Sequence, residues 1–380
     1  MQTVGVICEY NPFHLGHKKQ LDAIRAKFGP ETAIVCLMSG NFVQRGYPAV
    51  FDKMHRSEAA LRCGADLVLE LPVQYALSSA EGFAAGGVAI LSSICDTLCF
   101  GAETADGDLL MTTARALLSD RFPAALRAHL DAGLSFPAAR QAALADLGLD
   151  GKILETPNNI LAVEYCKAIL AQGCAMDFFP IRRGGSYHDI VADEKDPSAT
   201  AVRQLIAAED EWKPYVPKEA HFAFANAAVH ELRFGEKAIL ARLRTMTDAE
   251  FEALPYGSEG LWRKLMHESR RQTTLEEILT AVKSKRYTRS RLDRMVMCAF
   301  LGLRAADLET QPSYVRVLGF SDAGRSILGR HRESGFLRNI GEDTRQEYQL
   351  LERRCTALYG LFAQLPEPPD AEERYRVIRK

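Results

Sequence analysis

The stretch Glu9-Tyr10-Asn11-Pro12-Phe13-His14-Leu15-Gly16-His17 directly follows an apolar run, Val4–Cys8, and opens a segment with a helical pattern. A strand that leads at once into a helix is the first unit of a parallel α/β sheet. Ligands of such sheets bind at the carboxyl ends of the strands, where the helix offers free backbone N–H groups and its positive dipole end. Residues 9–17 therefore predict a phosphate-binding crevice.

Further apolar runs extend this pattern through the first half of the chain. They are Ala33–Met38, Leu67–Leu71, Thr97–Phe100 and Met176–Ile181. The run from Ala33 is apolar at every position, as expected for a strand that helices cover on both sides. We therefore predict an α/β domain with a parallel sheet over residues 1–205.

The second half of the chain shows a different pattern, because strand-like runs disappear after about residue 205. The segment Thr274-Leu275-Glu276-Glu277 is a capping box that predicts the start of a helix. Apolar residues between Leu292 and Leu303 recur at helical spacing and predict another helix. We therefore expect residues 206–380 to form a mainly helical domain.

Composition excludes several classes of protein. Of 380 residues, 47% are hydrophobic and 25% are charged, which fits neither a disordered nor a fibrous chain. The longest uncharged stretch, between Glu81 and Asp96, is too short for a bilayer span of roughly 20 residues. The first residues lack the basic region of a signal peptide. The nine cysteines include no C-x-x-C pair, so reduced thiols, no metal site and a cytoplasmic location are expected.

His14 and His17 are the first candidate catalytic residues. Their imidazoles lie on the first turn of the predicted helix and can donate hydrogen bonds to phosphate, while Gly16 lets a bulky ligand approach the backbone. A zinc site is a weaker alternative, because the pair lacks a nearby third ligand. Two structural histidines in a surface turn are the other alternative.

A second motif is Pro197-Ser198-Ala199-Thr200-Ala201-Val202-Arg203. The hydroxyls of Ser198 and Thr200, with the N–H groups of the turn, can bind the β- and γ-phosphates of a nucleotide. Arg203 can stabilise the charge that develops on departing pyrophosphate. Helix capping by the two hydroxyl residues is the competing interpretation.

Together the two motifs resemble the HxGH superfamily of nucleotidyltransferases, relatives of the class I aminoacyl-tRNA synthetases, which attack the α-phosphate of ATP and release pyrophosphate. Other segments make the chain similar, over essentially its whole length, to the tRNA(Met) cytidine acetate ligase family. These segments are Ser39–Gly46, Pro48-Ala49, Asp52-Lys53, Leu69–Pro72, Phe100–Glu103, Pro157–Leu161 and Tyr187–Asp189.

The resemblance implies a Rossmann-like HxGH nucleotidyltransferase domain with a parallel sheet, followed by a mainly α-helical tRNA-binding domain. It implies that acetate and ATP form acetyl-adenylate, and that the acetyl group passes to N4 of the wobble cytidine of elongator tRNA(Met). ATP is then a substrate, and Mg²⁺ is expected with it. The oligomeric state stays open.

The resemblance also implies a set of ATP-binding residues. Its main run comprises Ile7, Cys8, Glu9, Tyr10, Asn11, Pro12, Phe13, His14, Leu15, Gly16, His17, Lys18, Lys19 and Gln20. Further contacts are expected at Gly101, where a side chain would block adenine, at Asn158 or Asn159, and at Arg182 or Arg183. One of the two asparagines is also expected to cap a helix.

One loop departs from the family pattern, because Tyr47 follows Arg45-Gly46 where an acidic residue is expected. The role of this loop therefore stays open. Tyr187 and His188 follow two glycines and are expected in a flexible loop that covers the active site.

Charge is distributed unevenly along the chain. Residues 1–205 carry 18 Lys and Arg against 23 Asp and Glu, whereas residues 206–380 carry 29 against 26. The segment 283–294 holds six basic residues and one acid, between the two helices predicted above. Cations that hold phosphates around an aromatic that stacks on a base are typical of RNA loop recognition. The predicted tRNA-binding residues are Lys283, Lys285, Arg286, Tyr287, Arg289 and Arg291.

Other functions stay possible at this point. A solvated charged face would explain the basic segment without RNA. A small-molecule adenylyltransferase could use the same nucleotide motifs, with the helical half for dimerisation. A non-catalytic RNA-binding protein with a disabled nucleotide pocket is a third possibility, but intact His14, Gly16, His17 and Arg203 argue against it.

Overall fold

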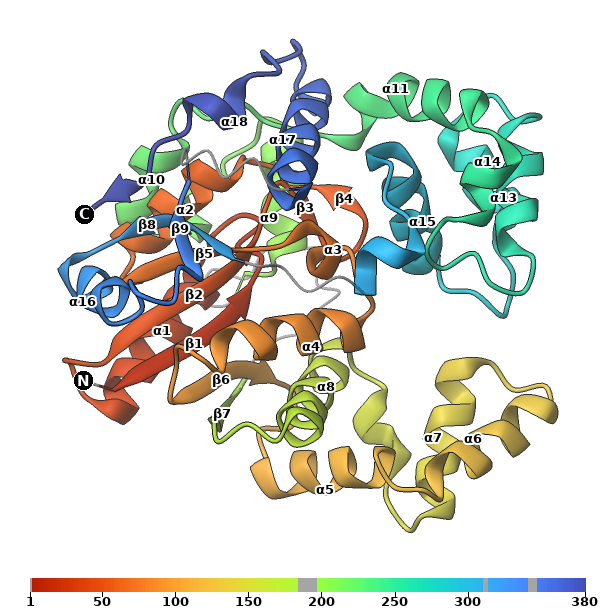
Figure 1. The fold of residues 1–380 in the computed structure, drawn as a ribbon, viewed down its shortest axis with the longest axis horizontal. Helices are drawn as coiled ribbons and strands as arrows, with labels where there is room; N and C mark the ends of the chain where they lie inside the picture. The colour runs from red at the N-terminus through yellow and green to blue at the C-terminus, as the bar shows by residue number, and fades with distance from the viewer. Residues whose placement is uncertain (1, 184–196, 310–313, 341–346) are drawn as a thin grey trace.

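The structure is a computed structural model that describes residues 2–183, 197–309, 314–340 and 347–380. Its centre is an eight-stranded sheet with the order β10-β8-β5-β2-β1-β6-β7, in which β9 pairs with β8. Helices cover both faces of this sheet (Figure 1). The motif Tyr187–Asp189 and the loop expected there lie outside the described residues.

The strands are β1 (Thr3–Cys8), β2 (Ala33–Ser39), β3 (Phe42–Val43), β4 (Tyr47–Pro48), β5 (Leu67–Leu71), β6 (Thr97–Ala102), β7 (Asp177–Arg182), β8 (Val315–Phe320), β9 (Leu337–Asn339) and β10 (Ile378–Arg379). The helices of the first half are α1 (Leu15–Phe28), α2 (Lys53–Arg62), α3 (Val73–Ala76), α4 (Ala80–Leu91), α5 (Gly107–Leu117), α6 (Phe122–Asp131), α7 (Phe136–Asp146), α8 (Pro157–Gln172) and α9 (Ala199–Ala207). Those of the second half are α10 (Lys218–Phe224), α11 (Leu232–Thr245), α12 (Asp248–Glu252), α13 (Leu261–Ser269), α14 (Leu275–Val282), α15 (Arg289–Leu301), α16 (Asp322–Arg330), α17 (Glu347–Tyr359) and α18 (Ala371–Arg374).

The predicted parallel sheet is confirmed. All five predicted strands are present within two residues of their expected bounds, as β1, β2, β5, β6 and β7. The neighbours β5, β2, β1, β6 and β7 pair in parallel along this series. The carboxyl ends of β1, β6 and β7 therefore meet at one edge of the sheet, beside the start of α1.

The expectation that strands end near residue 205 is wrong. Strand β8 returns to the same sheet and pairs antiparallel with β5. The predicted division at residue 205 therefore places one fully buried strand of the central sheet in the helical half. The last part of the chain, including β10, also packs at this edge of the sheet.

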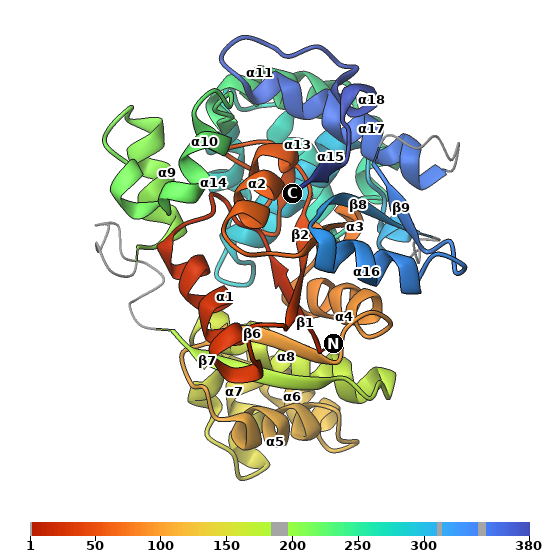
Figure 2. The same cartoon turned by 90° about the vertical axis from the view of Figure 1, so that its left-hand side faces the viewer.

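Two apolar layers explain why the strands have no polar face. Alternate residues of β2 point to opposite sides, so that Val35 and Leu37 belong to one core and Ile34 and Cys36 to the other. The first core is completed by α4, α5 and α8, and the second by α1, α2 and α10. Figure 2 shows α1 and α2 on one side of the sheet and α4 and α8 on the other.

Most of the second half forms a helical lobe with a core of its own. Residues from α11, α13, α14 and α15 pack together there, and Phe42 and Leu77 of the first half join them. The predicted capping box is confirmed, because the Thr274 side chain accepts from Glu277 N while the Glu277 carboxylate accepts from Thr274 N. Among the helices in the described ranges, none is long and apolar enough to cross a membrane.

A buried network of charged side chains joins the end of the chain to the sheet. Lys53 Nζ lies 3.0 Å from Glu70 Oε1 and 2.7 Å from Glu372 Oε2. Arg316 of β8 pairs with Glu70, Glu352 and Glu372. All five side chains are at most 5% exposed. Arg316 can therefore occupy a buried strand, because acidic partners from distant parts of the sequence surround it.

Candidate active site

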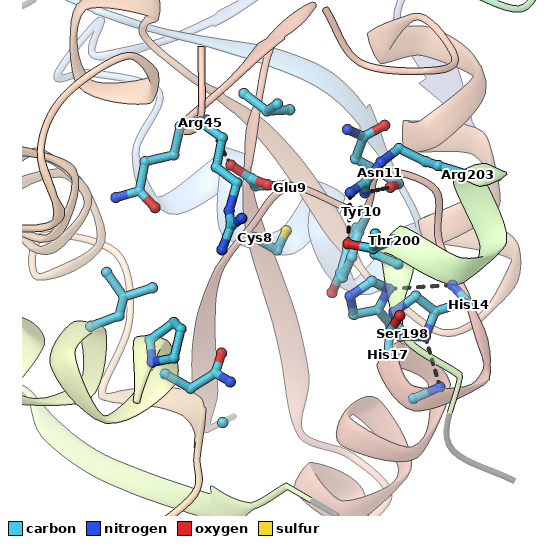
Figure 3. Close-up of a pocket in the computed structure, with 18 of the residues that line it drawn as sticks. Cys8, Glu9, Tyr10, Asn11, His14, His17, Arg45, Ser198, Thr200 and Arg203 are labelled. Atoms are coloured by element: carbon cyan, nitrogen blue, oxygen red, sulfur yellow. Dashed lines mark hydrogen bonds between the residues drawn. The ribbon is translucent and has the colours of Figure 1, made fainter. Parts of the chain in front are cut away.

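A cavity of about 880 Å³ opens at the carboxyl ends of β1, β6 and β7, above the start of α1. Figure 3 shows His14, His17, Ser198, Thr200 and Arg203 together on one side of it. The two predicted phosphate-binding motifs, separated by most of the α/β domain in sequence, thus lie on the same wall. This is the arrangement expected for a nucleotide site in a parallel sheet.

The histidine pair has a hydrogen-bond pattern that fixes both tautomers. His14 is the N-cap of α1, and its Nδ1 accepts from Gly16 N at 3.1 Å. His17 Nδ1 accepts from His14 N at 3.2 Å. Because both Nδ1 atoms are acceptors, each neutral ring carries its proton on Nε2. Capping and ligand binding are therefore compatible, since they use opposite nitrogens of each ring.

Both imidazoles are neutral at pH 7. Burial, then the charges of Arg183, Arg203 and Lys19, lower the pKa of His14 to about 3. Burial, followed by His14 and Arg183, holds the pKa of His17 well below its usual value. His14 Nε2 is buried and has no hydrogen-bond partner within the described residues. An N–H donor of this kind needs a ligand atom to accept from it.

The second motif lies beside the histidine pair and completes the phosphate-binding end. Ser198 caps α9 by accepting from Ala201 N at 3.0 Å, so the capping interpretation is correct for this residue. Its hydroxyl can still donate, because a hydroxyl is both donor and acceptor. Arg203 donates to Asn11 O at 2.7 Å and to Thr200 Oγ1 at 3.0 Å. The bond to Asn11 attaches α9 to the loop that precedes α1, and the two bonds together fix the guanidinium at the cavity.

Three of the predicted ATP contacts, which come from β6, from α8 and from the residue after β7, lie together. Gly101, Asn158 and Arg183 all line the cavity, and Arg183 Nη1 donates to Asn158 Oδ1 at 3.1 Å. The expectation that a side chain at Gly101 would block adenine stays a prediction, and the structure adds a second reason for glycine here. A Cβ at this position would lie 2.7 Å from Arg183 Cδ, so the missing side chain makes room for Arg183. Arg182 also reaches the cavity wall.

The two asparagines have different roles. Asn159 is buried and bonds Thr104, through Oδ1 at 2.8 Å and Nδ2 at 3.2 Å, and it does not line the cavity. The expectation that one of them caps a helix is wrong. Glu103 does this from the end of β6, accepting from Asn158 Nδ2 at 2.7 Å and Asn159 N at 2.7 Å. A carboxylate beside free N–H groups at a helix start is favourable, and sequence alone does not reveal this distant partner.

Some residues of the expected ATP-binding run are not at the cavity surface. Phe13 is fully buried in the core beneath α1, and Lys18 turns away to pair with Asp22. Pro12 and Leu15 are also absent from the cavity wall. The helical period explains this for Leu15 and Lys18, because a helix presents only one side to a ligand, whereas Pro12 and Phe13 precede α1. The other ten residues of the run line the cavity.

The hairpin formed by β3 and β4 is a part of the cavity that sequence reasoning misses. Gln44, Arg45 and Tyr47 of this hairpin line the cavity on the side away from the histidines. The structure shows what holds it in place, because Tyr47 Oη donates to Asp293 Oδ2 of α15 at 2.8 Å. Gly46 has φ +83°, and a Cβ there would lie 2.5 Å from Arg294 N, so glycine permits both the turn and the contact.

Comparisons with known proteins agree with this geometry. Residues 1–374 match the model of the family described as HIGH Nucleotidyl Transferase. A tRNA(Met) cytidine acetate ligase of Clostridium novyi is 38% identical over 347 residues, which cover 86% of each chain. The chain belongs to this ligase family. A second relative of the same name, from Thermosipho melanesiensis, is 35% identical over 88% of this chain and 83% of its own.

Solved structures lead to the same ligase family. The crystal structure of apo Thermotoga maritima TmcAL matches with a TM-score of 0.90 and 30% identity, and covers 100% of both chains. The same protein bound with alpha-thio ATP matches with a TM-score of 0.88. The sheet and the helical lobe described above are therefore features that this chain shares with a ligase-family neighbour.

In this member of the ligase family, the basic segment covers the loop between α14 and α15 and the first residues of α15, which begins at Arg289, three residues earlier than the predicted helix. Its tip is a tight turn in which Ser284 pairs with Tyr287. Lys283, Lys285 and Arg286 are exposed there. The segment is thus placed at a surface, as tRNA binding requires.

Several members of the segment have partners within the protein, including the exposed Arg286, which pairs with Glu259 at 3.2 Å. Arg289 bonds Glu276 at 2.6 Å and Asp293 at 2.9 Å. Arg291 donates to Tyr256 O at 2.8 Å and lies over the ring of Tyr287. The helices are held together by these contacts, so the interpretation of every cation in the segment as a ready phosphate ligand is too broad.

Because the buried histidines are neutral, we expect the free energy of unfolding to depend on pH in the acid range. Because the folded pKa of His14 is about 3, the unfolded chain binds a proton below pH 6.5 that the folded chain does not. The free energy of unfolding should therefore fall as pH drops, by about 1.4 kcal/mol per pH unit for each such histidine. His14→Asn keeps a capping oxygen and should reduce this slope by that amount. Urea denaturation between pH 6 and pH 5 measures it, and an equal slope in both proteins would contradict the prediction.

Proposed function

We propose that this protein is an ATP-dependent ligase that activates acetate as acetyl-adenylate and acetylates N4 of the wobble cytidine of elongator tRNA(Met). The relatives named as tRNA(Met) cytidine acetate ligases and the neighbour bound with alpha-thio ATP support it. The observation that carries the proposal is the pair of neutral imidazoles at the start of α1. Both rings line the same cavity as Arg203, and their Nδ1 atoms are occupied by backbone N–H groups.

The geometry suits attack on the α-phosphate of ATP. An oxygen of acetate forms the new P–O bond, the bond to the β-phosphate breaks, and pyrophosphate leaves with the electron pair. His14 and His17 donate hydrogen bonds to phosphate oxygens, and the backbone N–H groups of α1 add their dipole. Arg203 stabilises negative charge on the departing pyrophosphate. Acetate is already ionised, so this step needs no general base.

Mg²⁺ is proposed to enter with ATP rather than to occupy a protein site. Among the described residues, no group of three His, Cys, Asp or Glu could hold a metal ion. The side chains at the phosphate-binding end are imidazoles, hydroxyls and a guanidinium, which supply no carboxylate for Mg²⁺. This ion often takes its ligands from substrate phosphates and water.

A cytoplasmic location completes the proposal. All nine cysteines are unpaired, and eight of them are buried. Unpaired thiols are the normal state of cytoplasmic proteins.

The deciding experiment is nucleoside analysis by mass spectrometry of tRNA incubated with the protein, ATP and labelled acetate. We expect a labelled acetyl group on cytidine of elongator tRNA(Met) and on no other tRNA. A small-molecule adenylyltransferase would instead release pyrophosphate with a mononucleotide and leave the tRNA unlabelled. That result would replace the proposal by the alternative.

The exposed tip of the basic segment should bind tRNA backbone. Removing Lys283, Lys285 and Arg286 together by alanine substitution should weaken tRNA binding and spare acetate-dependent ATP–pyrophosphate exchange. If all three contact phosphates, the slope of log affinity against log salt becomes shallower by about 2–3 units. Filter binding at several salt concentrations measures this slope.

A matched control removes three cations on the far side of the molecule. Arg325, Arg330 and Arg332 are exposed on and after α16, which Figure 1 shows on the opposite side from α14 and α15. Alanine at these positions should leave the slope unchanged. Equal slopes in both triple variants would mean that the basic segment is only a solvated surface.

A further inference from the structure

Glu9 is a carboxylate in an unexpected place, because it belongs to the run that is expected to bind a polyanionic nucleotide. A negative charge beside phosphates is unfavourable. Figure 3 shows the Glu9 side chain on the side of the cavity that carries Arg45, away from the rings of His14 and His17. Its position therefore suggests a partner other than the triphosphate.

Glu9 is also the better placed of two carboxylates. Among the described residues that line the cavity, only Glu9 and Glu231 carry one. Glu231 forms an ion pair with Arg233 at 2.5 Å at the start of α11. Glu9 Oε1 accepts from Gln44 N at 2.7 Å, while its second oxygen, Oε2, makes no hydrogen bond within the described chain. One oxygen thus fixes the side chain, and the other can accept from a ligand.

The backbone that carries Glu9 is rigidly held. Arg56 is fully buried, and its Nη1 donates to Glu9 O at 2.6 Å and to Ser39 O at 3.1 Å. Its Nε donates to Phe51 O at 2.8 Å. Arg56 therefore ties the carboxyl ends of β1 and β2 together directly beneath Glu9. A catalytic carboxylate requires this kind of fixed support.

The β3–β4 hairpin beside Glu9 connects the cavity with the proposed tRNA surface. Tyr47 is bonded to Asp293 on α15, and Asp293 is bonded to Arg289 at the start of that helix. The exposed cations of the basic segment immediately precede this point. A tRNA loop held by these cations would thus present its bases toward the hairpin side of the cavity.

We propose that Glu9 accepts a hydrogen bond from the N4 amine of the acceptor cytosine and takes up its proton during acetyl transfer. Carboxylates are the usual acceptors for this amine. N4 forms a bond to the acetyl carbonyl carbon, and the acetyl C–O bond breaks. AMP leaves with the electron pair of that bond, and one N4 proton passes to Glu9 Oε2. This role rests on the proposed function and assigns the chemistry of its second half-reaction.

Glu9→Gln tests the role with little structural change, because its amide oxygen can still accept from Gln44 N. Because Glu9 also lines the cavity expected to hold ATP, acetate-dependent ATP–pyrophosphate exchange is measured at saturating ATP, and it should fall far less than acetyl transfer, since that step needs no base. Acetyl transfer from preformed acetyl-adenylate to tRNA in a single turnover should fall by about 10²–10⁴. Hydroxylamine, a strong nucleophile that needs no base, should still trap the enzyme-bound adenylate. Glu58→Gln, in an exposed pair with Arg62 on α2, is the matched control.

Four results would overturn the assignment of Glu9 as the proton acceptor. The first is an acetyl-transfer rate in Glu9→Gln equal to that of wild type. The second is loss of acetyl transfer in Glu231→Gln but not in Glu9→Gln. A raised KM for ATP in the exchange reaction would show that Glu9 binds the adenine of ATP. Loss of exchange would show that Glu9 is needed for the adenylation step or for folding. The proposed function itself fails only if the wild-type protein shows no acetate-dependent exchange and no transfer.

Discussion

Replacing His17 by alanine is expected to lower acetate-dependent ATP–pyrophosphate exchange by about 10²–10³, the usual loss for one transition-state donor. The Nε2 proton of His17 is available to phosphate because Nδ1 already accepts from His14 N. The same substitution also removes one half of the capping box that starts α1. Helix capping contributes only about 1 kcal/mol, so the protein should stay folded while exchange is lost.

The control for this experiment is His267→Ala, because His267 is exposed on α13, within the helical lobe. It should leave exchange unchanged. Affinity for tRNA should be nearly equal in both variants, since the proposed tRNA surface lies on α14 and α15. Wild-type exchange in His17→Ala would remove this histidine from the mechanism.

Lys53→Met is expected to lower the free energy of unfolding by about 3–5 kcal/mol, the typical result of removing one partner from a buried ion pair. Lys53 is fully buried between Glu70 and Glu372, and no water can replace its charge at either carboxylate. The pKa of Glu352 shows that negative charge is unfavourable at its position in this network. Burial, then the charge of Glu70, raises its pKa to about 7.

Urea denaturation of Lys53→Met and of Arg270→Met compares a buried with an exposed ion pair. Arg270 pairs with Asp248 at the surface, so its removal should cost at most about 1 kcal/mol. Adding Glu372→Gln to Lys53→Met should restore part of the loss, because it removes one uncompensated charge. Equal stability of the two single variants would show that the buried network contributes no more than a surface pair.

Apolar runs in the sequence predict the first half of the fold well. Residues 67–71 are apolar except for Glu70, and this run coincides with β5 in both bounds. The strand β8 escapes prediction because Arg316 interrupts its apolar run after a long helical region. Glu70, Glu352 and Glu372 help to make this charge tolerable in a buried strand, and none of them is near it in sequence.

In the candidate site, too, residues of local motifs can be predicted from the sequence, whereas contacts between distant residues cannot. His14, His17 and Arg203 belong to local motifs, and the structure places all three at one cavity. The roles of Asn158 and Asn159 could not be separated, because Glu103 and Thr104 on another element decide which amide faces the cavity. Likewise, Arg289 looks like a phosphate ligand in sequence, and its contacts with Glu276 and Asp293 become visible only in the folded chain.

The position of β8 beside β5 has a consequence for synthesis on the ribosome. The whole buried strand β5 is made early, but its neighbour on one side ends only at Phe320. At about 5–20 residues per second, the nascent chain would wait roughly 10–50 s for this partner. During that time the apolar edge of β5 is open to pairing with other chains. The order of synthesis therefore leaves one edge of the central sheet unpaired until β8 has been made.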